Sequence, residues 1–173
     1  MNPHNLAKMS VSKRLIKEYK DITNSRECLE NRISIGLLKD NDYTTWRATI
    51  IGADDTPYKG GVFQLEISIP PTYPFKPPKV RFLNKVFHPN INSTGEICID
   101  ILKHNWSPAL TIDKTLLSIC LLMAAPNPDD PLDPTAADLL KRDPEGYKKK
   151  VRDWVLKYAN GELDKKPSPP SLD

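Results

Sequence analysis

Cys98 is the residue of this chain whose type and setting most suggest covalent chemistry. It lies in the segment HPNINSTGEICIDIL, residues 88–102. A thiol in such a place could ligate a metal, act as a nucleophile or serve as a small buried hydrophobe. The two other cysteines, Cys28 and Cys120, lie far away and no CxxC pair exists, so neither a zinc ribbon nor a thioredoxin-like redox site has support.

Metal binding at Cys98 would need more ligands than the sequence supplies. His88 and Cys98 are two ligands, a structural zinc site has four, and the chain has only three histidines. A cysteine hydrolase needs a base within reach of the thiol; His88 could serve, but the local signatures of such hydrolases are missing. Burial is the default for an isolated thiol, and we assign it to the other two cysteines. A Pro-Asn pair and a long irregular loop around Cys98 favour function there.

Apolar periodicity shows which elements must position this loop. Residues at helical spacing from Val11 to Ile22 predict an amphipathic, basic helix that begins near residue 10. Strand-like runs follow, with short connections of turn residues that indicate an antiparallel meander. The predicted strands are residues 32–38, 44–51, 61–69 and 79–83. Five prolines within residues 70–78 exclude a central strand there.

The second half of the chain reads as one loop followed by helices. Residues 84–110 have no sustained period, which is typical of a functional loop. A helix begins after Thr111, and Asp133-Pro134 and Asp143-Pro144 each resemble a cap with proline in the first turn. We therefore predict an α+β fold with an N-terminal helix, a four-stranded antiparallel meander sheet and three further helices. The domain is assigned to residues 10–160, between an N-terminal tail, 1–9, and a disordered C-terminal tail, 161–173.

Composition restricts the function classes. The 173 residues are 39% hydrophobic and 27% charged, as in an ordinary globular domain. No apolar run could cross a membrane and the N-terminus is too polar for a signal peptide, so we expect a cytoplasmic and/or nuclear protein with no membrane partner. A net charge of +3 gives no argument for nucleic acid as a partner.

The charges are nevertheless unevenly distributed along the chain. Residues 1–26 hold six Lys/Arg and two Asp/Glu, whereas residues 127–145 hold six Asp/Glu and two Lys/Arg. Two solvated faces would explain this pattern. A basic docking surface at one end and a carboxylate-rich site at the other would explain it equally well.

The segment HPNINSTGEICIDIL strongly resembles the active-site segment of ubiquitin-conjugating enzymes. PYKGGVFQLEISIP, YPFKPPKV, WSPALTI and LLMAAPNPDDPLDP resemble further motifs of that family, in the same order and at matching spacings, so the resemblance covers about residues 10–159. The fold of the family agrees with the fold that the periodicities predict.

This resemblance implies a transferase that receives ubiquitin from the ubiquitin-activating enzyme as a thioester on Cys98. The ubiquitin then passes to the lysine amine of a protein substrate, promoted by RING-type ligases. No bound cofactor and no metal is implied, because ATP is consumed upstream by the activating enzyme. We expect the enzyme to act as a monomer.

The resemblance also implies roles for residues near Cys98. Asn90 matches the asparagine credited with donating an N–H to the oxyanion, and bracing the loop is the alternative. Asp130 matches the acid that positions the attacking amine and accepts its proton, and capping a turn is the alternative. Ala125 stands where many members carry an acid, which leaves linkage and acceptor preference open. The residues that match supports of the loop are His88, Pro89 and Asn127.

Partner surfaces carry over from the same resemblance. The residues that match the face for the activating enzyme are Lys13, Arg14 and Lys17. Those that match the ligase-binding loops are Phe75, Ser107, Pro108 and Ala109. Those that match the face for the donor ubiquitin are Lys114, Leu117, Ser118 and Leu121. Ser34 lies near a backside ubiquitin site of the family, although the neighbouring loop differs in length.

Two other functions remain to be separated from this one. Catalytically inactive, ubiquitin-binding variants of the fold lack the cysteine and its asparagine, whereas Cys98, Asn90 and Asp130 are all present here. Conjugation of SUMO or NEDD8 is the second. DILKHNWSP lacks the insertion that follows the cysteine of the SUMO enzyme, and the NEDD8 enzyme has a longer N-terminal extension.

Overall fold

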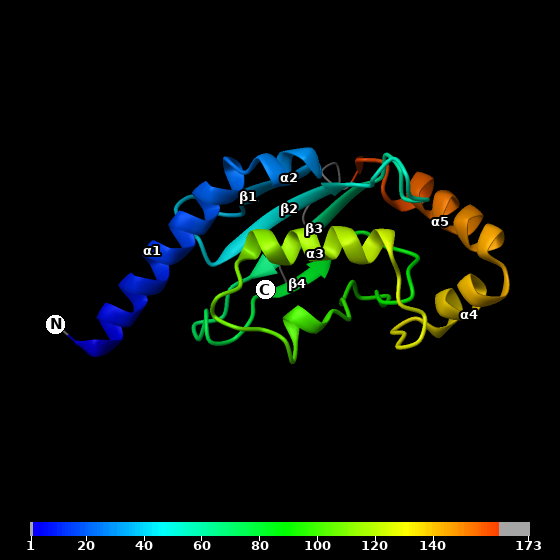
Figure 1. Cartoon of the computed structure of the whole chain (residues 1–173). Helices are drawn as coiled ribbons and strands as arrows, with labels where there is room; N and C mark the ends of the chain where they lie inside the picture. Colours follow the sequence, from blue (N-terminus) through cyan, green and yellow to red (C-terminus); the bar gives the residue numbers. More distant parts are fainter. Residues whose placement is uncertain (1, 163–173) are drawn as a thin grey trace, which may run out of the picture.

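The computed structural model describes residues 2–162, and Figure 1 shows its elements in chain order. The part of the predicted disordered tail from residue 163 onward lies outside the described residues. The four strands follow one another in the chain, and helices precede and follow them. The elements are α1 (Pro3–Thr23), α2 (Arg26–Glu30), β1 (Ile33–Leu37), β2 (Thr45–Ile51), β3 (Val62–Ser68), β4 (Lys79–Phe82), the 3₁₀ helix η1 (Asp100–Leu102), α3 (Ile112–Ala124), α4 (Pro134–Arg142) and α5 (Pro144–Tyr158).

The four strands form one antiparallel sheet in the order β1-β2-β3-β4, which confirms the predicted meander. Its register places Ala48 opposite Leu65, and Leu65 opposite Phe82, so a buried row crosses the three strands. Along β2 buried residues alternate with partly exposed ones. Because successive side chains of a strand point to opposite faces, one face of the sheet packs on the core and the other carries the polar residues.

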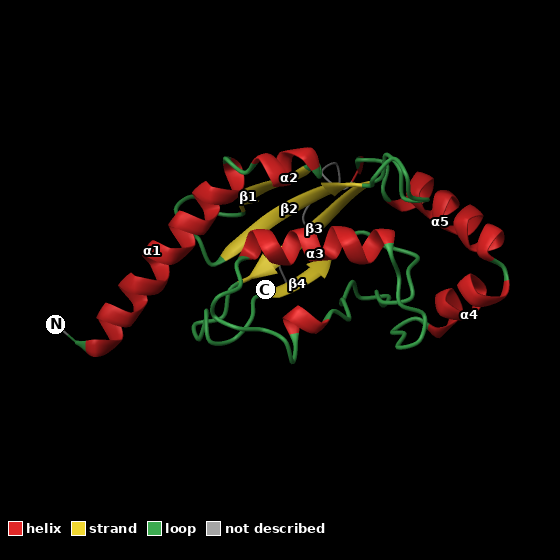
Figure 2. Ribbon diagram, viewed as in Figure 1, coloured by secondary structure: helices red, strands yellow, loops and turns green. Residues whose placement is uncertain are grey.

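Helix α3 supplies much of the core on the packed side of the sheet (Figure 2). Ile112, Leu116, Ile119 and Met123 lie at helical spacing, and all four are buried in the same cluster as the inward side chains of the strands. The predicted apolar stripe of this helix is therefore confirmed. Burial of such side chains stabilises a fold by about 1.5–3 kcal/mol each.

The first helix begins earlier than the sequence predicts. It starts at Pro3, and the Asn2 side chain accepts a hydrogen bond from the His4 N–H, so residues 3–9 are helical rather than a tail. Asparagine as cap with proline in the first turn starts a helix even where no apolar stripe exists yet. In Figure 1 this N-terminal part of α1 projects away from the body of the molecule.

Helix α2 is absent from the sequence prediction because its five residues are too few to show a period. The Ser25 hydroxyl caps it by accepting a hydrogen bond from the Cys28 N–H at 3.1 Å. The predicted caps of the last two helices are confirmed: Asp133 accepts from the Ala136 N–H at 3.1 Å, and Asp143 caps α5 in the same way. Within residues 2–162 no helix has both the length and the apolar character needed to cross a bilayer.

Candidate active site

The irregular segment 84–110 is fixed to the sheet by close backbone contacts. Gly95 has a φ of +84°, and its carbonyl accepts a hydrogen bond of 2.9 Å from the Phe82 N–H of β4. A Cβ atom at residue 95 would lie 1.9 Å from the Phe82 carbonyl oxygen, so only glycine fits. Ile91 then bridges to Ile97 in an antiparallel manner. These contacts place the next residue, Cys98, at the surface.

Cys98 is partly exposed, and its N–H donates a hydrogen bond of 2.9 Å to the Asn90 carbonyl. The two other thiols lie in different settings. Burial raises the pKa of Cys28, and it raises the pKa of Cys120 to about 12. Because the thiolate is the nucleophile, these two are poor candidates. Among residues 2–162, no three His, Cys, Asp or Glu side chains gather in a way that could hold a metal ion.

His88 lies beneath the loop as a buried connection and not beside the thiol as a base. Its Nε2–H donates to the Leu122 carbonyl at 2.8 Å, and its Nδ1 accepts the Asn90 N–H at 2.9 Å. Burial lowers the His88 pKa to about 4. At neutral pH the ring is therefore uncharged and both nitrogens are occupied, so His88 joins the end of α3 to the loop of Cys98.

The buried side chain of Asn90 connects the loop of Cys98 to the acidic loop of residues 127–130. Its Nδ2 donates to the Asn127 carbonyl at 2.8 Å and to the Asp130 carbonyl at 3.2 Å, while Oδ1 accepts the Asn127 N–H at 2.8 Å. The Asn90 backbone carbonyl already binds Cys98. Asn90 thus holds residues 127–130 against the loop of Cys98. This is the loop-bracing role, which the sequence analysis gives as the alternative to binding the oxyanion.

The loop that carries Asp130 is held at both ends. Asn127 Oδ1 accepts the Asp129 N–H at 3.1 Å, and the Pro89 carbonyl accepts N–H groups from Leu132 and Asp133 at 2.8 and 3.0 Å. Asp129 pairs with Lys141 of α4 at 3.0 Å. Asp130 is exposed on the same loop. Its backbone carbonyl is the one that accepts the hydrogen bond from Asn90 Nδ2.

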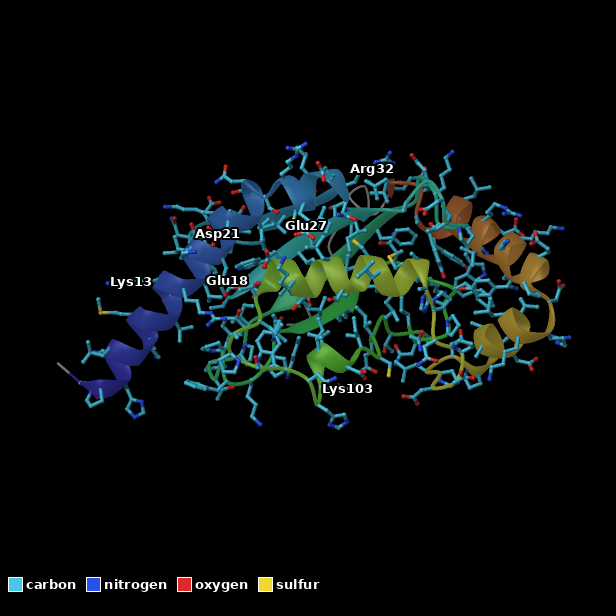
Figure 3. All side chains as sticks on the ribbon, viewed as in Figure 1. Lys13, Glu18, Asp21, Glu27, Arg32 and Lys103 are labelled. Carbon is cyan, nitrogen blue, oxygen red and sulfur yellow. The ribbon has the colours of Figure 1, made fainter. Side chains whose placement is uncertain are left out.

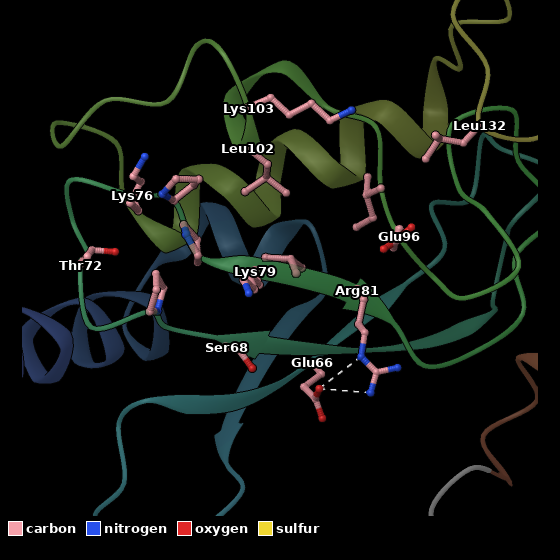
Figure 4. Close-up of a pocket in the computed structure, with 15 residues that line it drawn as sticks. Glu66, Ser68, Thr72, Lys76, Lys79, Arg81, Glu96, Leu102, Lys103 and Leu132 are labelled. Atoms are coloured by element: carbon pink, nitrogen blue, oxygen red, sulfur yellow. Dashed lines mark hydrogen bonds and ion pairs between the residues drawn. The ribbon is translucent and has the colours of Figure 1, made fainter.

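Lys103 is a residue near the thiol that the sequence did not indicate. Its Nζ lies 3.4 Å from Cys98 Sγ. It follows η1 and lines the rim of a groove of about 880 Å³ between this loop and the β4 edge of the sheet (Figure 4). A spacing of five residues carries no signal by itself, because only the turn between the two residues brings Lys103 back to Cys98.

The two predicted ligase-binding loops form one surface. Phe75 is 78% exposed. Trp106 donates its indole N–H to the Pro74 carbonyl at 2.8 Å, which joins the loop of Phe75 to the segment that follows Trp106. The exposed residues of that segment are Ser107, Pro108 and Ala109.

The three basic residues predicted to form one face of α1 differ in their exposure. Lys13 is exposed on the projecting part of the helix (Figure 3), and Lys17 is exposed while it pairs with Asp21 at 2.7 Å. Arg14 is turned inward: its side chain is only 30% exposed, it pairs with Glu18 at 3.1 Å, and its Nη2 donates to the Leu110 carbonyl at 2.9 Å. Arg14 therefore connects α1 to the segment before α3, and 30% of its side chain remains exposed.

One correction concerns α3. Leu117, which the resemblance places on the face for the donor ubiquitin, is 8% exposed and belongs to the core. A helix that is apolar on most sides gives no periodic signal for the side that faces inward. The described face consists of Lys114, which pairs with Glu27 at 3.2 Å, together with Ser118 and the exposed Leu121. Ser34 is exposed on β1.

Comparison with known proteins agrees with this geometry. The family model described as ubiquitin-conjugating enzyme matches residues 14–155. The E2 domain of a Toxoplasma gondii ubiquitin-conjugating enzyme is a similar solved structure, with 43% sequence identity and a TM-score of 0.76 over 85% of this chain and 97% of that one. The match extends over the sheet, the thiol loop, the loop of Asp130 and most of the helices. This chain belongs to the ubiquitin-conjugating enzyme family.

Proposed function

We propose that this enzyme receives ubiquitin from the activating enzyme as a thioester on Cys98 and transfers it to a lysine amine of a protein substrate. The observation that carries the proposal is the set of hydrogen bonds of Asn90. Its backbone carbonyl binds the Cys98 N–H at 2.9 Å, and its side chain binds the Asp130 carbonyl at 3.2 Å. One buried residue thereby holds the backbone of the nucleophile's loop and the backbone of the loop that bears Asp130, which supports a two-step acyl transfer at this site.

In the first transfer the Cys98 thiolate attacks the thioester that the activating enzyme carries. One C–S bond forms while another breaks, so the acyl group keeps its reactivity. The partly exposed position of Cys98 supports this step, because the attacking sulfur must meet the C-terminus of a second protein.

In the second transfer a lysine amine replaces the sulfur. An ordinary lysine has a pKa of about 10.4, so its ammonium must lose a proton as it attacks. The exposed Asp130 is the proposed acceptor of that proton. Neutral His88, with both ring nitrogens bound, is not available for it. To stabilise the oxyanion, the Asn90 amide would give up its longer hydrogen bond, the one of 3.2 Å to the Asp130 carbonyl, and donate to the oxyanion instead.

Partners and setting follow from the same proposal. RING-type ligases bind the surface of Phe75 and Ser107–Ala109, and the activating enzyme contacts Lys13 and Lys17 on α1. No cofactor needs to bind, since ATP acts upstream. The enzyme acts as a monomer, in the cytoplasm or the nucleus.

A charging assay tests the proposal. Incubation with activating enzyme, ATP and ubiquitin should produce an adduct that thiol reductant removes on gels. Cys98→Ala should abolish it, Cys98→Ser should give a reductant-resistant ester, and Cys120→Ser is the matched control that keeps the thioester. An adduct that survives Cys98→Ala would contradict the proposal, and so would charging with SUMO or NEDD8 by their own activating enzymes in place of ubiquitin.

Discharge of the purified thioester to free lysine tests the second transfer. Asp130→Ala should leave charging intact and slow discharge about 100-fold, whereas the neighbouring Asp129→Ala should not. Asn90→Ala should slow discharge about 100- to 1000-fold if its amide also binds the oxyanion. Equal losses of charging and discharge in Asp130→Ala would argue against its assigned role.

A further inference from the structure

The groove between β4 and the turn that carries Lys103 has a basic rim. The charged side chains that line it are four cations and two carboxylates: Lys76, Lys79, Arg81, Lys103, Glu66 and Glu96. Arg81 and Glu66 pair with each other at 3.2 Å. Lys76 and Lys79 are both exposed, and neither forms an ion pair with another residue of the range 2–162. The groove therefore carries positive charge that the described part of the chain does not neutralise.

This groove leads directly to the thiol. Lys103 lines the groove, and its Nζ lies 3.4 Å from Cys98 Sγ. Figure 4 shows Lys76 at one end of the groove and Leu132 at the other, with Lys103 between them on the side opposite β4. A chain that lies along the groove passes beside Lys103. A lysine of that chain is therefore brought close to the acyl carbon that would be bonded to Sγ.

The edge of β4 that faces away from β3 offers backbone groups to such a chain. The Leu83 N–H donates to the Gln64 carbonyl at 2.8 Å, so in this antiparallel register the N–H and C=O groups of Val80 are directed away from β3. Phe82 has the same direction, and its N–H donates to the Gly95 carbonyl at 2.9 Å. No backbone partner among the described residues takes up the outward groups of Val80. An unpaired edge of this kind accepts another strand.

Apolar side chains form the floor of the groove. Val80 and Ile97 are buried, and Leu102 packs against the core. No described residue that lines the groove is aromatic. Single-stranded nucleic acid binds where a basic groove also provides aromatic rings on which bases stack. The combination of basic rim, apolar floor and free strand edge therefore favours a polypeptide as the occupant.

We propose that this groove binds an extended, acidic segment of the protein substrate that flanks its acceptor lysine. The carboxylates of that segment pair with Lys76 and Lys79, and its backbone pairs with β4 at Val80. Main-chain hydrogen bonds of an added strand provide affinity, and its side chains provide specificity. The inference rests on the proposed transfer from Cys98 and names the class of acceptor: a lysine with Asp or Glu close to it in sequence.

Discharge of the purified thioester to short peptides tests the inference. Three peptides carry one lysine in the same extended sequence, flanked by Glu, by Gln or by Arg. At low salt the Glu peptide should react about five- to tenfold faster than the Gln peptide, through a lower KM, and the Arg peptide should be the slowest. Salt screens exposed charges, so at about 1 M salt the difference should fall below about twofold. Equal rates for the Glu and Gln peptides at low salt would overturn the inference.

A double variant locates the source of the preference. Lys76→Gln combined with Lys79→Gln should reduce the ratio of the Glu-peptide rate to the Gln-peptide rate below about twofold. Lys59→Gln, at an exposed position in the connection from β2 to β3 and outside the groove, is the matched control that should keep the ratio. The ratio compares two peptides on one enzyme, so a general loss of activity does not change it. An unchanged ratio in the double variant would show that the groove does not select the acceptor.

Backbone methylation tests the pairing with β4. Two Glu peptides carry N-methyl groups on alternate amides, and the two sets are displaced by one residue. Because alternate N–H groups of a strand point to the same side, one methylated peptide should react at least about threefold more slowly than the other. Equal rates would overturn the pairing at Val80.

Two further results separate this inference from its alternatives. A single-stranded oligonucleotide that competes as strongly as the Glu peptide would assign the groove to nucleic acid and overturn the inference. Normal charging, with discharge to free lysine but no preference among the peptides, would overturn the acidic groove alone. Failure to form any thioester on Cys98 would overturn the proposed function and this inference together.

Discussion

Around Cys98, side chains that reach the surface lie on loops that buried side chains hold together. Cys98, Lys103 and Asp130 reach the surface, while His88 and Asn90 lie in the interior and bind backbone groups. The buried pair joins the thiol loop to the end of α3 and to residues 127–130. Buried polar groups with all partners present rigidify a site, and the loss of one partner leaves another unpaired.

His88 makes the stability of the fold depend on pH. Its pKa is about 4 in the folded state, below the ordinary value of 6.5, so the unfolded chain binds the proton more readily. The stabilisation is complete above pH 6.5 and is lost as the pH falls toward 4, by about 3 kcal/mol in all. Urea unfolding between pH 7 and 4 measures it.

His88→Gln retains an N–H for the Leu122 carbonyl and should remove this part of the pH dependence. His104→Gln, at an exposed position, is the control that should keep it. The same slope in wild type and His88→Gln would show that other groups are responsible.

Glu18 connects three elements of the fold from the buried side of α1. Its carboxylate accepts hydrogen bonds from the Ile112 N–H at 2.8 Å, the Tyr73 hydroxyl at 2.6 Å and the Arg14 Nε at 3.1 Å. Figure 3 shows it on the side of α1 that faces the start of α3. Glu18 of α1 thus caps the start of α3. The same carboxylate binds Tyr73, which lies two residues before Phe75.

Glu18→Ala should lower the free energy of unfolding by about 3 kcal/mol. The substitution leaves a buried N–H, a hydroxyl and a guanidinium without their acceptor. Asp21→Ala, one turn further along α1, removes only an exposed pair with Lys17 and should change stability by less than about 0.5 kcal/mol. Chemical denaturation measures both, and similar values for the two variants would contradict the connecting role of Glu18.

Across the whole molecule, the proposed nucleophile and part of the proposed ligase surface lie on one continuous stretch of chain. Residues 98–110 contain Cys98, Lys103 and the loop of Ser107–Ala109, and the Trp106 indole binds this stretch to the loop of Phe75. The long α1 projects at one end, and the sheet separates it from α4 and α5 at the other (Figure 1).

Phe75→Ala should act on ligase-stimulated discharge alone. Phe75 is exposed, so its removal should change stability by less than about 0.5 kcal/mol and leave charging unaffected. As an aromatic anchor in an interface it should account for at least about a tenfold loss of RING-stimulated discharge. Leu156→Ala, at an exposed apolar position on α5, is the control. An equal loss of unstimulated discharge would place Phe75 outside the ligase surface.

The elements were predictable where the signal is local. All four strands lie within one residue of their predicted ends, because alternation and turn residues operate over a few positions. The observed α1 starts seven residues before its predicted start, because the Asn2-Pro3 cap precedes the apolar stripe that predicts the helix. The sequence does not predict α2, because five residues are too few to show a helical period.

The sequence by itself determined the family fold, the caps of the last two helices and Cys98 as the candidate nucleophile. Periodicity, cap chemistry and motif spacing depend on residues that are close together in the chain, so they can be recognised without the structure. Only the tertiary structure decided that Arg14 turns inward, that Leu117 is buried and that Asn90 joins two loops. Those outcomes depend on partners far along the chain: Leu110 lies 96 residues from Arg14, and Asn127 lies 37 from Asn90. Even the short step from Cys98 to Lys103 depended on the fold, since the direction of a turn decides whether two side chains meet.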